Sequence, residues 1–483
     1  MQLSLGEIAQ ILGCPAPRVP GLARGYAIDS RQIRPGEVFF ALRGEQHDGH
    51  EYVLGAVGAG ALGAVVEAST FERFAPPFRD RLLPVPDPQR ALQQLAQVAR
   101  RRWGRKVIGI TGSAGKTTTK EMVAAVLGTR YRVLKTEGNL NNHLGLPLTL
   151  LRLNSGHEIA VVEMGMNHAG EIAHLATLAA PQVGVVTNVG PVHLEFFGSL
   201  EGIAGAKREL IEALPAQGVA VLNADDPLVA RFGDGFGGKV VLYGGQPGQG
   251  GKEPDFRVYR HDGQDAGGLV VQAAGTGLSG HDGQPTAVDL KFLGTHNASN
   301  ALAALATGLV FGVGLAAGAR ALGRLAPSSA RGEIFQLPWR GGAITLVDDS
   351  YNSNPPALRQ MLRVLAGLPA RRRVLVAGEM RELGPAAAAL HRELGAEMAR
   401  SGVDAVFAVQ GTAQEFVTGA QAAGFAGVAR FFPDAAACRP ALEAFVEPGD
   451  VILAKASRGV RLERAIEGLK RAGSDVRGMM CGE

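Results

Sequence analysis

Short apolar runs recur along the chain, and most of them lead into a turn and then an amphipathic stretch. In the N-terminal part, such runs predict strands over 38–42 and 61–67, and apolar residues at helical spacing predict a helix over 87–103. Four further apolar runs predict strands over 107–111, 158–165, 183–190 and 219–225. Strands that alternate with helices predict a parallel sheet with crossover helices.

The pattern changes between residues 245 and 290, where Gly, Asp and Gln clusters separate short β-like pieces. We interpret that stretch as an antiparallel excursion of the central sheet. Residues 301–319 carry no charge, but Ala and Gly dominate them, and because such a sequence inserts poorly into a bilayer they predict a buried helix. After a hinge near Pro327, four apolar runs predict strands over 344–350, 373–380, 405–409 and 450–457.

This pattern predicts three domains, and 483 residues at roughly 150 per domain favour the same number. We place the domains at residues 1–103, 104–326 and 327–483. The expected fold class is α/β, with a small N-terminal α/β domain, a central parallel-sheet domain with an antiparallel excursion, and a C-terminal Rossmann-like domain.

The composition is typical of a soluble globular protein, with 46% hydrophobic residues, 19% charged residues and a net charge of +4. The absence of a long basic block argues against a nucleic-acid partner. The N-terminus lacks a basic region and carries Glu7 early, so we expect no secretory signal peptide. Three widely separated cysteines, Cys14, Cys438 and Cys481, predict reduced thiols in a cytoplasmic protein without membrane insertion.

The strongest local signal is ITGSAGKTTTK, which stands between a predicted strand and a predicted helix. Its loop residues are Gly112, Ser113, Ala114, Gly115, Lys116, Thr117 and Thr118. The glycines let backbone N–H groups face anionic oxygens. Lys116 can reach terminal phosphates, and the hydroxyl of Thr117 or Thr118 can ligate magnesium. This shorter G-x-x-G-K-T-T form of a phosphate loop predicts ATP binding but not what the energy is used for.

Glu163 ends the next apolar strand, and a carboxylate there, beside a phosphate loop, suits a magnesium site. A solvated glutamate is common at strand ends, so the loop is what favours the metal interpretation. The residues by themselves indicate a three-domain ATP-binding enzyme with a magnesium site.

Motifs spread over nearly the whole chain resemble those of the Mur ligase family. They are GSAGKTT (112–118), EGNLNNHLGLPLTLL (137–151), EMGMNHAGEI (163–172), NVGPVHLEFFGSLEGIAGAKRELIEAL (188–214), GTHNASNALAALA (294–306), RGE (331–333), DDSYNSNPPA (348–357), GEMRELG (378–384) and KASRGVRLE (455–463). The segment IDSRQIRPGEVFFALRGEQHDGH (28–50) is similar to a uridine-nucleotide domain shared by two members of that family. NLNNHLGLP, EMGMNHAGEI, DDSYNSNP and GEMRELG resemble the member that adds D-alanyl-D-alanine.

The resemblance implies an ATP-dependent ligase of peptidoglycan precursor synthesis. ATP would phosphorylate the C-terminal carboxylate of UDP-MurNAc-tripeptide, and the amino group of D-alanyl-D-alanine would attack the resulting acyl phosphate. Because two anionic reactants meet, the site needs positive charge and a metal ion. We therefore expect ATP and magnesium as cofactors, these two substrates as partners, and a monomer.

The resemblance also implies roles at the phosphate end of the site. Lys116 would hold the ATP phosphates, Thr117 would bind magnesium, and Glu163 and His193 would be magnesium-side ligands. Lys207 matches a lysine that is carbamylated in related ligases. About one free lysine in 2,500 is neutral at pH 7, so carbamylation needs a site that lowers the pKa or traps the product. A solvated helix lysine and a surface histidine are the alternatives for Lys207 and His193.

For the nucleotide, Asn297 and Asn300 suit recognition of the adenine edge, with helix N-capping as an alternative. Arg331 would touch the γ-phosphate from the hinge, and Asp349 would meet the nucleotide from the third domain. The other implied substrate contacts are Ser30 and Arg31 near the uridine diphosphate, Asn139, Asn141 and Asn142 near the muramoyl group, Asn352 and Asn354 near the dipeptide, and Lys455, Ser457 and Arg458 on the third-domain cleft face. Solvated surface positions are the alternative for the last three.

Two residues depart from the family pattern in the third domain. Ala456 stands where the family usually has Gly in K-G-S-R, and Glu379 stands where Asp is usual.

Three other functions remain open at this point. The first is the Mur ligase that adds the preceding residue of the peptide, Lys or diaminopimelate. It shares several motifs, but its D-N-P-R motif is missing from the third-domain sequence. Folylpolyglutamate synthase lacks a uridine-nucleotide domain, so residues 28–50 argue against it. A nucleotide-binding switch needs only the phosphate loop and leaves Glu163, His193 and Lys207 unexplained. The third residue of the tripeptide is not determined by the sequence.

Overall fold

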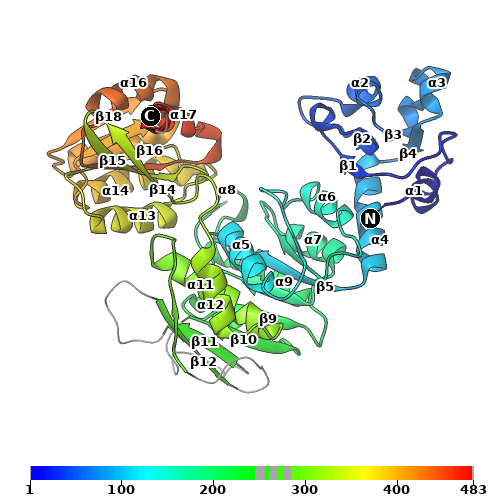
Figure 1. Cartoon of the computed structure of the whole chain (residues 1–483), viewed down its shortest axis with the longest axis horizontal. Coiled ribbons are helices and arrows are strands. Elements are labelled where there is room, and N and C mark those ends of the chain that lie inside the picture. Colours follow the sequence, from blue (N-terminus) through cyan, green and yellow to red (C-terminus); the bar gives the residue numbers. More distant parts are fainter. Residues whose placement is uncertain (1, 193, 245–255, 261–268, 276–283, 481–483) are drawn as a thin grey trace.

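Three sheets follow one another along the chain and form the three lobes of Figure 1, coloured blue, cyan to green, and yellow to red. The computed structural model describes residues 2–192, 194–244, 256–260, 269–275 and 284–480. Helices pack on each sheet, which confirms the α/β class and the expected architecture of three parts. The domain boundaries at 103/104 and 326/327 stay predictions.

The first sheet is parallel, in the order β1-β2-β3-β4. Its strands are β1 (Gly25–Ala27), β2 (Glu37–Phe40), β3 (Gly63–Glu67) and β4 (Leu82–Val85). The helices of this part are α1 (Leu5–Leu12), α2 (Val53–Gly58), α3 (Pro76–Arg79) and α4 (Pro88–Trp103). The strands predicted over 38–42 and 61–67 are β2 and β3, and the predicted helix is α4.

Helix α4 connects the first sheet to the central one. It begins where Asp87 accepts two backbone N–H groups as the N-cap and Pro88 fills the first helical position. Its other end is fastened to the central part, since the buried Arg100 donates from Nε to the carbonyl of Ala179 at 2.6 Å. The polar first turns of α4 are therefore held in a fixed place beside the central sheet.

Among the described residues, the central sheet has nine strands in the order β13-β12-β11-β10-β9-β8-β5-β7-β6. They are β5 (Lys106–Thr111), β6 (Val133–Lys135), β7 (Ile159–Glu163), β8 (Val183–Val186), β9 (Val219–Asn223), β10 (Lys239–Tyr243), β11 (Phe256–Arg260), β12 (Leu269–Gly275) and β13 (Thr286–Val288). The predicted excursion is confirmed for β12, which runs antiparallel to β11 and β13, whereas β11 is still parallel to β10. The rest of that prediction, at 245–255, 261–268 and 276–283, lies outside the described residues.

The helices of the central part are α5 (Lys116–Leu127), α6 (Gly145–Leu151), α7 (Glu171–Ala179), α8 (Leu194–Phe197), α9 (Leu200–Glu212), α10 (Pro227–Ala230), α11 (Thr295–Val310) and α12 (Leu315–Arg324). The uncharged segment 301–319 is buried as predicted, but one continuous helix was wrong, because α11 ends and α12 begins within it. Gly312 adopts φ of +70° between them, which a helix cannot accommodate. Within the described ranges, no helix has the length and apolar character needed to span a bilayer.

The third sheet has the order β14-β15-β19-β16-β17-β18. Its strands are β14 (Glu333–Trp339), β15 (Gly342–Asp349), β16 (Arg372–Gly378), β17 (Ala405–Val409), β18 (Val428–Phe432) and β19 (Asp450–Lys455). Its helices are α13 (Pro355–Gly367), α14 (Ala387–Ala399), α15 (Gln414–Ala422), α16 (Ala435–Phe445) and α17 (Glu463–Met480). The four predicted strands are β15, β16, β17 and β19, whereas the antiparallel edge strand β14 was not predicted.

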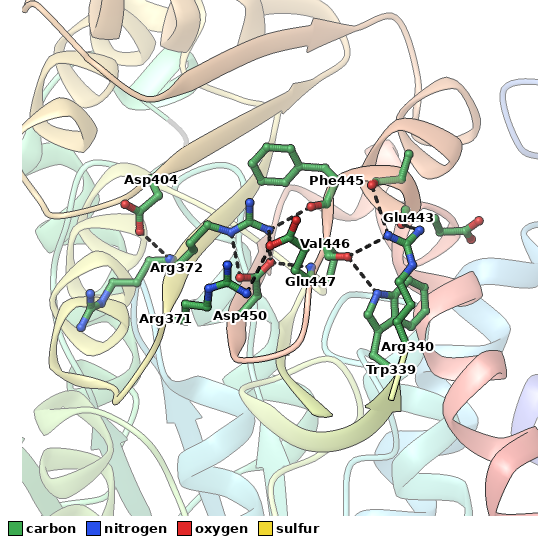
Figure 2. Close-up of polar contacts among 12 residues, drawn as sticks. Trp339, Arg340, Arg371, Arg372, Asp404, Glu443, Phe445, Val446, Glu447 and Asp450 are labelled. Atoms are coloured by element: carbon green, nitrogen blue, oxygen red, sulfur yellow. Dashed lines mark hydrogen bonds and ion pairs between the residues drawn. The ribbon is translucent and has the colours of Figure 1, made fainter. Parts of the chain in front are cut away.

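Polar contacts fasten this sheet to the loop that follows α16 (Figure 2). Trp339 at the end of β14 donates from Nε1 to the carbonyl of Val446 at 2.9 Å. Arg372 at the start of β16 forms a 2.7 Å ion pair with Asp450, whose side chain is fully buried at the start of β19. These contacts lie at the amino ends of β16 and β19, which leaves the carboxyl ends of both strands free to face the central part.

Candidate active site

A cavity of about 1870 Å³ lies between the three parts of the chain. It is lined by the first turns of α4, by the loops after β5, β7, β8 and β9, and by the loops after β15, β16 and β19. In open α/β sheets, ligands bind outside the carboxyl ends of the strands. The cavity is therefore the place where the fold favours a substrate site.

The phosphate loop joins β5 to α5, and the space around it requires two glycines. Gly112 has φ of +150°, and a Cβ there would lie 1.8 Å from Thr187 Oγ1. Gly115 has φ of +79°, and a Cβ there would lie 2.5 Å from Asn300 Oδ1. Only glycine fits both positions, so the loop brings its backbone close to the cavity, where the first turn of α5 presents N–H groups without helical partners.

Two amides of this loop are already bonded within the protein. The N–H of Ser113 donates to the carbonyl of Asn188 at 2.9 Å, and the N–H of Ala114 donates to Asn188 Oδ1 at 2.9 Å. Ser113 and Ala114 line the cavity, but their amides shape the loop. The N–H groups from Gly115 to Thr118, at the start of α5, are the ones available to an anion.

Lys116 folds back over its own loop, with Nζ donating to the carbonyl of Gly112 at 2.7 Å. Burial lowers the pKa of the Lys116 ammonium, the Glu163 carboxylate raises it, and the Arg331 guanidinium lowers it. Burial makes an uncompensated positive charge unfavourable. A phosphate bound beside this ammonium would therefore stabilise its charged form.

Glu163 at the end of β7 is 2% exposed, so a solvated strand-end carboxylate is wrong for this position. Thr117 Oγ1 donates to its Oε2 at 2.8 Å, and Asn141 Nδ2 donates to its Oε1 at 2.7 Å. A carboxylate and a hydroxyl fixed side by side fit a magnesium ion that completes its coordination with phosphate oxygens and water. Asn141, expected beside the muramoyl group, uses its amide to orient Glu163.

Lys207 on α9 lines the same cavity and is 2% exposed, so the solvated helix lysine is wrong as well. Burial, and secondarily the charge of Lys116, hold the pKa of the Lys207 amine well below its ordinary value. Within the described residues, its Nζ has neither a hydrogen bond nor an ion pair. A lowered pKa favours the neutral amine, which is the form that reacts with carbon dioxide.

Asn297 and Asn300 both line the cavity but do not cap α11, whose N-cap is Gly294 without a side-chain bond. Asn300 Nδ2 donates to Asn297 Oδ1 at 3.0 Å, and Thr119 Oγ1 on α5 donates to Asn300 Oδ1 at 3.1 Å. The pair therefore ties α11 to the phosphate-loop helix, which rules out the capping alternative and leaves the adenine role a prediction.

The third part contributes an ion pair to the cavity. Lys455 at the end of β19 is 4% exposed, and its Nζ lies 2.5 Å from Asp349 Oδ2 and 2.9 Å from the carbonyl of Asn352. Ser457 Oγ accepts the backbone N–H of Arg381 at 3.0 Å. A solvated surface is therefore wrong for Lys455 and Ser457, which are buried and position neighbouring loops.

Other third-domain residues divide between structural and open roles. Asn354 Oδ1 caps α13 by accepting the N–H of Ala357 at 2.9 Å. Arg458 lines the cavity and pairs with Glu463 at 3.1 Å.

Both departures from the family pattern are accommodated. The methyl group of Ala456 faces Gly378, where a Cβ would lie 2.5 Å from it. Glu379 Oε1 accepts the backbone N–H and the hydroxyl of Thr412.

Ser30 and Arg31 do not join this cavity. They lie in a short 3-10 helix of the N-terminal part, where the exposed Arg31 pairs with Asp29 at 2.8 Å. Asn139 and Asn142 do line the cavity, although Asn142 Oδ1 also accepts the N–H of Gly145 at the start of α6.

Several lining residues were missed. They are Asp87, Gln89, Arg90 and Gln93 at the start of α4, His296 beside Asn297, and Tyr351, Arg381 and Glu382 in the third part. The Asp-Pro pair and the polar first turns of α4 were a sequence signal that could have identified the first four residues. His296 is half-buried, its buried Nδ1 atom lacks a hydrogen-bond partner among the described residues, and desolvation lowers its pKa to about 4.

His193, predicted as a magnesium-side ligand, lies outside the described residues, as does Cys481. Cys14 and Cys438 are free thiols.

Comparison with known proteins identifies the family. Residues 23–100, 110–308 and 331–458 match the models of the Mur ligase family catalytic domain, the Mur ligase middle domain, and the Mur ligase glutamate ligase domain. UDP-N-acetylmuramoyl-tripeptide–D-alanyl-D-alanine ligase of Bacillus subtilis is 35% identical over 446 residues, covering 92% of this chain and 93% of that protein. The chain belongs to the Mur ligase family.

Further relatives of this Mur ligase agree over its whole length. The enzyme of the same name from Escherichia coli is 35% identical over 479 residues, covering 98% of this chain and 100% of that protein. Among solved structures, MurF from Acinetobacter baumannii superposes with a TM-score of 0.82 at 29% identity, covering 98% of this chain and 99% of that one. MurF ligase from Thermotoga maritima, solved in complex with ADP, gives 0.75 at 29% identity, with 94% and 98% covered.

Proposed function

We propose that this Mur ligase joins D-alanyl-D-alanine to the tripeptide carboxylate of UDP-MurNAc-tripeptide, with ATP as the energy source. The observation that carries the proposal is a single cavity that joins the phosphate loop, the buried amine of Lys207 and polar loops of the third part. Relatives at 35% identity over nearly their full length carry the name of this activity.

The nucleotide is proposed to lie between the central and third parts. Lys116 and the amides from Gly115 to Thr118 would hold its phosphates, because they face the cavity at a helix N-terminus. Asn297 and Asn300 would meet the adenine edge, with Arg331 at the γ-phosphate and Asp349 reaching the nucleotide from the third part.

Magnesium fits the pair formed by Thr117 and Glu163, and it would neutralise phosphate charge there. We also propose that His193 lies on the metal side. Lys207 is proposed to carry a carbamate: its neutral amine attacks carbon dioxide, a C–N bond forms, and one proton leaves to solvent. The buried cation site would thereby gain a negative charge.

In the reaction, a carboxylate oxygen of the tripeptide attacks the γ-phosphorus of ATP, and the bond to the ADP oxygen breaks. The neutral amine of the dipeptide then attacks the acyl carbon, an amide bond forms, one proton from the nitrogen leaves to solvent, and inorganic phosphate leaves. Lys116 and Arg331 place two positive charges where the transferred phosphoryl group carries its negative charge.

The remaining contacts are assigned by position. We propose the dipeptide beside Asn352, Lys455 and Arg458, with Asn354 and Ser457 shaping their loops. The muramoyl group would lie beside Asn139 and Asn142, and the uridine nucleotide near Ser30 and Arg31. A cytoplasmic monomer is part of the same proposal, since ATP and the nucleotide-linked substrate are cytoplasmic compounds.

Phosphate release tests the activity. Purified protein would be mixed with ATP, magnesium and UDP-MurNAc-tripeptide, with and without D-alanyl-D-alanine. Release that depends on the dipeptide is the expected result. Release that instead depends on Lys or diaminopimelate with UDP-MurNAc-dipeptide would assign the preceding ligase activity, and no release with any acceptor would exclude a ligase.

A further inference from the structure

Tyr351 is an aromatic residue of the cavity to which the proposed reaction gives no role. It follows β15, and the Arg331 guanidinium carbon lies 3.9 Å from the centre of its ring. Arg458 approaches the same ring less closely, at 5.8 Å, and is already paired with Glu463. A contact of 3.9 Å is a stacked cation–π pair, in which the ring restrains the guanidinium.

The backbone delivers Arg331 to this ring. Ala330 and Gly332, on either side, both adopt positive φ, at +57° and +79°. The carbonyl of Ala330 accepts the N–H of Tyr351 at 3.0 Å, and the N–H of Gly332 donates to the carbonyl of Asp348 at 2.9 Å. Residues 330–332 are therefore fastened to the end of β15, so Arg331 moves as part of the third sheet.

Stacking leaves the N–H groups of Arg331 unused. Among the described residues, no carboxylate or carbonyl accepts a hydrogen bond from its side chain, although an arginine carries five N–H donors. The charge of Arg331 is felt by Lys116 of the phosphate loop. Arg331 and Lys116 line the same cavity, so the donors of the guanidinium are available there to an anion.

Tyr351 is not explained by packing. The ring is half-buried, and Tyr351 belongs to none of the hydrophobic clusters of the described residues. Shortening it should therefore open no void in a core.

We propose that Tyr351 is a positioning residue that holds the Arg331 guanidinium toward the terminal phosphate of a bound nucleoside triphosphate. The inference rests on the proposed function in taking ATP as the nucleotide and in placing Arg331 at its γ-phosphate. It predicts that the Tyr351 ring raises the affinity for nucleotides with a third phosphate and has little effect on the affinity for nucleotides without one.

The test compares ADP with a non-hydrolysable ATP analogue by calorimetry. Tyr351→Leu should weaken the analogue between about fivefold and thirtyfold, the range of one cation–π contact, and change ADP affinity less than about twofold. Tyr351→Phe keeps the ring and should restore most of the lost affinity. In the Arg331→Lys background, Tyr351→Leu should have little further effect, because the stacked pair is already lost.

Phe71→Leu serves as the control, since Arg79 lies 5.6 Å from that ring in the N-terminal part; both ligands should bind it as they bind the wild type. Equal weakening of ADP and the analogue by Tyr351→Leu, or an undiminished effect in the Arg331→Lys background, would overturn the inference. A different result would overturn the proposed function, namely wild-type protein that releases no phosphate with D-alanyl-D-alanine.

Discussion

Asn141 and Glu163 are joined by a 2.7 Å hydrogen bond from the asparagine amide to one carboxylate oxygen. Thr117 holds the other oxygen, so the carboxylate is oriented from both sides. Partners of this kind fix the geometry of metal ligands, and their loss typically weakens a metal site tenfold to a hundredfold.

Asn141→Leu should therefore weaken Mn²⁺ binding in the presence of ADP by about tenfold or more. Electron paramagnetic resonance of free Mn²⁺ measures this without turnover. Asn154→Leu, in an exposed turn, is the control and should bind Mn²⁺ as the wild type does. Unchanged binding in Asn141→Leu would separate this asparagine from the metal site.

Gly112→Ala should weaken ADP binding by at least about tenfold. The substitution adds a Cβ 1.8 Å from Thr187 Oγ1 at φ of +150°, so the loop must shift, and backbone strain of this kind costs about 1–3 kcal/mol. Gly205→Ala is the matched control, because a Cβ at Gly205 on α9 meets nothing within 4 Å. Calorimetric titration with ADP compares the two, and equal affinity would remove the steric argument.

Lys207→Met should raise the free energy of unfolding at pH 7. The native amine has a pKa well below its ordinary value because it is buried, whereas an unfolded lysine titrates near 10.4. Between the lowered native pKa and 10.4 the unfolded chain binds more protons than the native protein, so the lysine costs stability, and the gain from its removal shrinks as the pH rises through 10.4. Urea unfolding in carbonate-free buffer at pH 7 and pH 10 measures both values.

Lys120→Met provides the contrast. Lys120 is equally buried, but its Nζ donates to the carbonyl of Thr136 at 2.7 Å and lies 3.1 Å from Glu121. Its removal leaves the buried carbonyl of Thr136 unsatisfied, although Glu121 keeps its pair with Lys135, and should lower stability by roughly 1–3 kcal/mol. A gain for Lys120→Met, or a gain for Lys207→Met that does not depend on pH, would show that the two lysines were assigned wrongly.

The fold was predictable where local pattern decides it. The run from β5 through Gly112 and Gly115 into α5 is a strand, a turn that needs glycine, and a helix, and each is visible in sequence. The break between α11 and α12 and the hairpin that creates β14 also had local signals, in Gly312 and in Arg340–Gly341, where both residues adopt positive φ. In the prediction, the uncharged composition of residues 301–319 outweighed the first signal, and the βα alternation outweighed the second.

The site was predictable only where one residue's type decides its role. Asn141 lies 22 positions before Glu163, and Thr119 lies 181 positions before Asn300, so their hydrogen bonds depend on tertiary packing. The contribution of α4 to the cavity likewise depends on how Arg100 fastens that helix to the central part. Sequence motifs identified the polar residues of the site. Only the fold shows which of these residues form hydrogen bonds with one another.

The proposed reaction attaches a dipeptide to a tripeptide. Mass spectrometry of the product formed from ATP, magnesium, UDP-MurNAc-tripeptide and D-alanyl-D-alanine tests this most directly. The expected product has the mass of the nucleotide substrate plus the dipeptide less one water, and it forms together with ADP and phosphate. A nucleotide substrate left at its original mass, while UDP-MurNAc-dipeptide gains a single Lys or diaminopimelate, would contradict it.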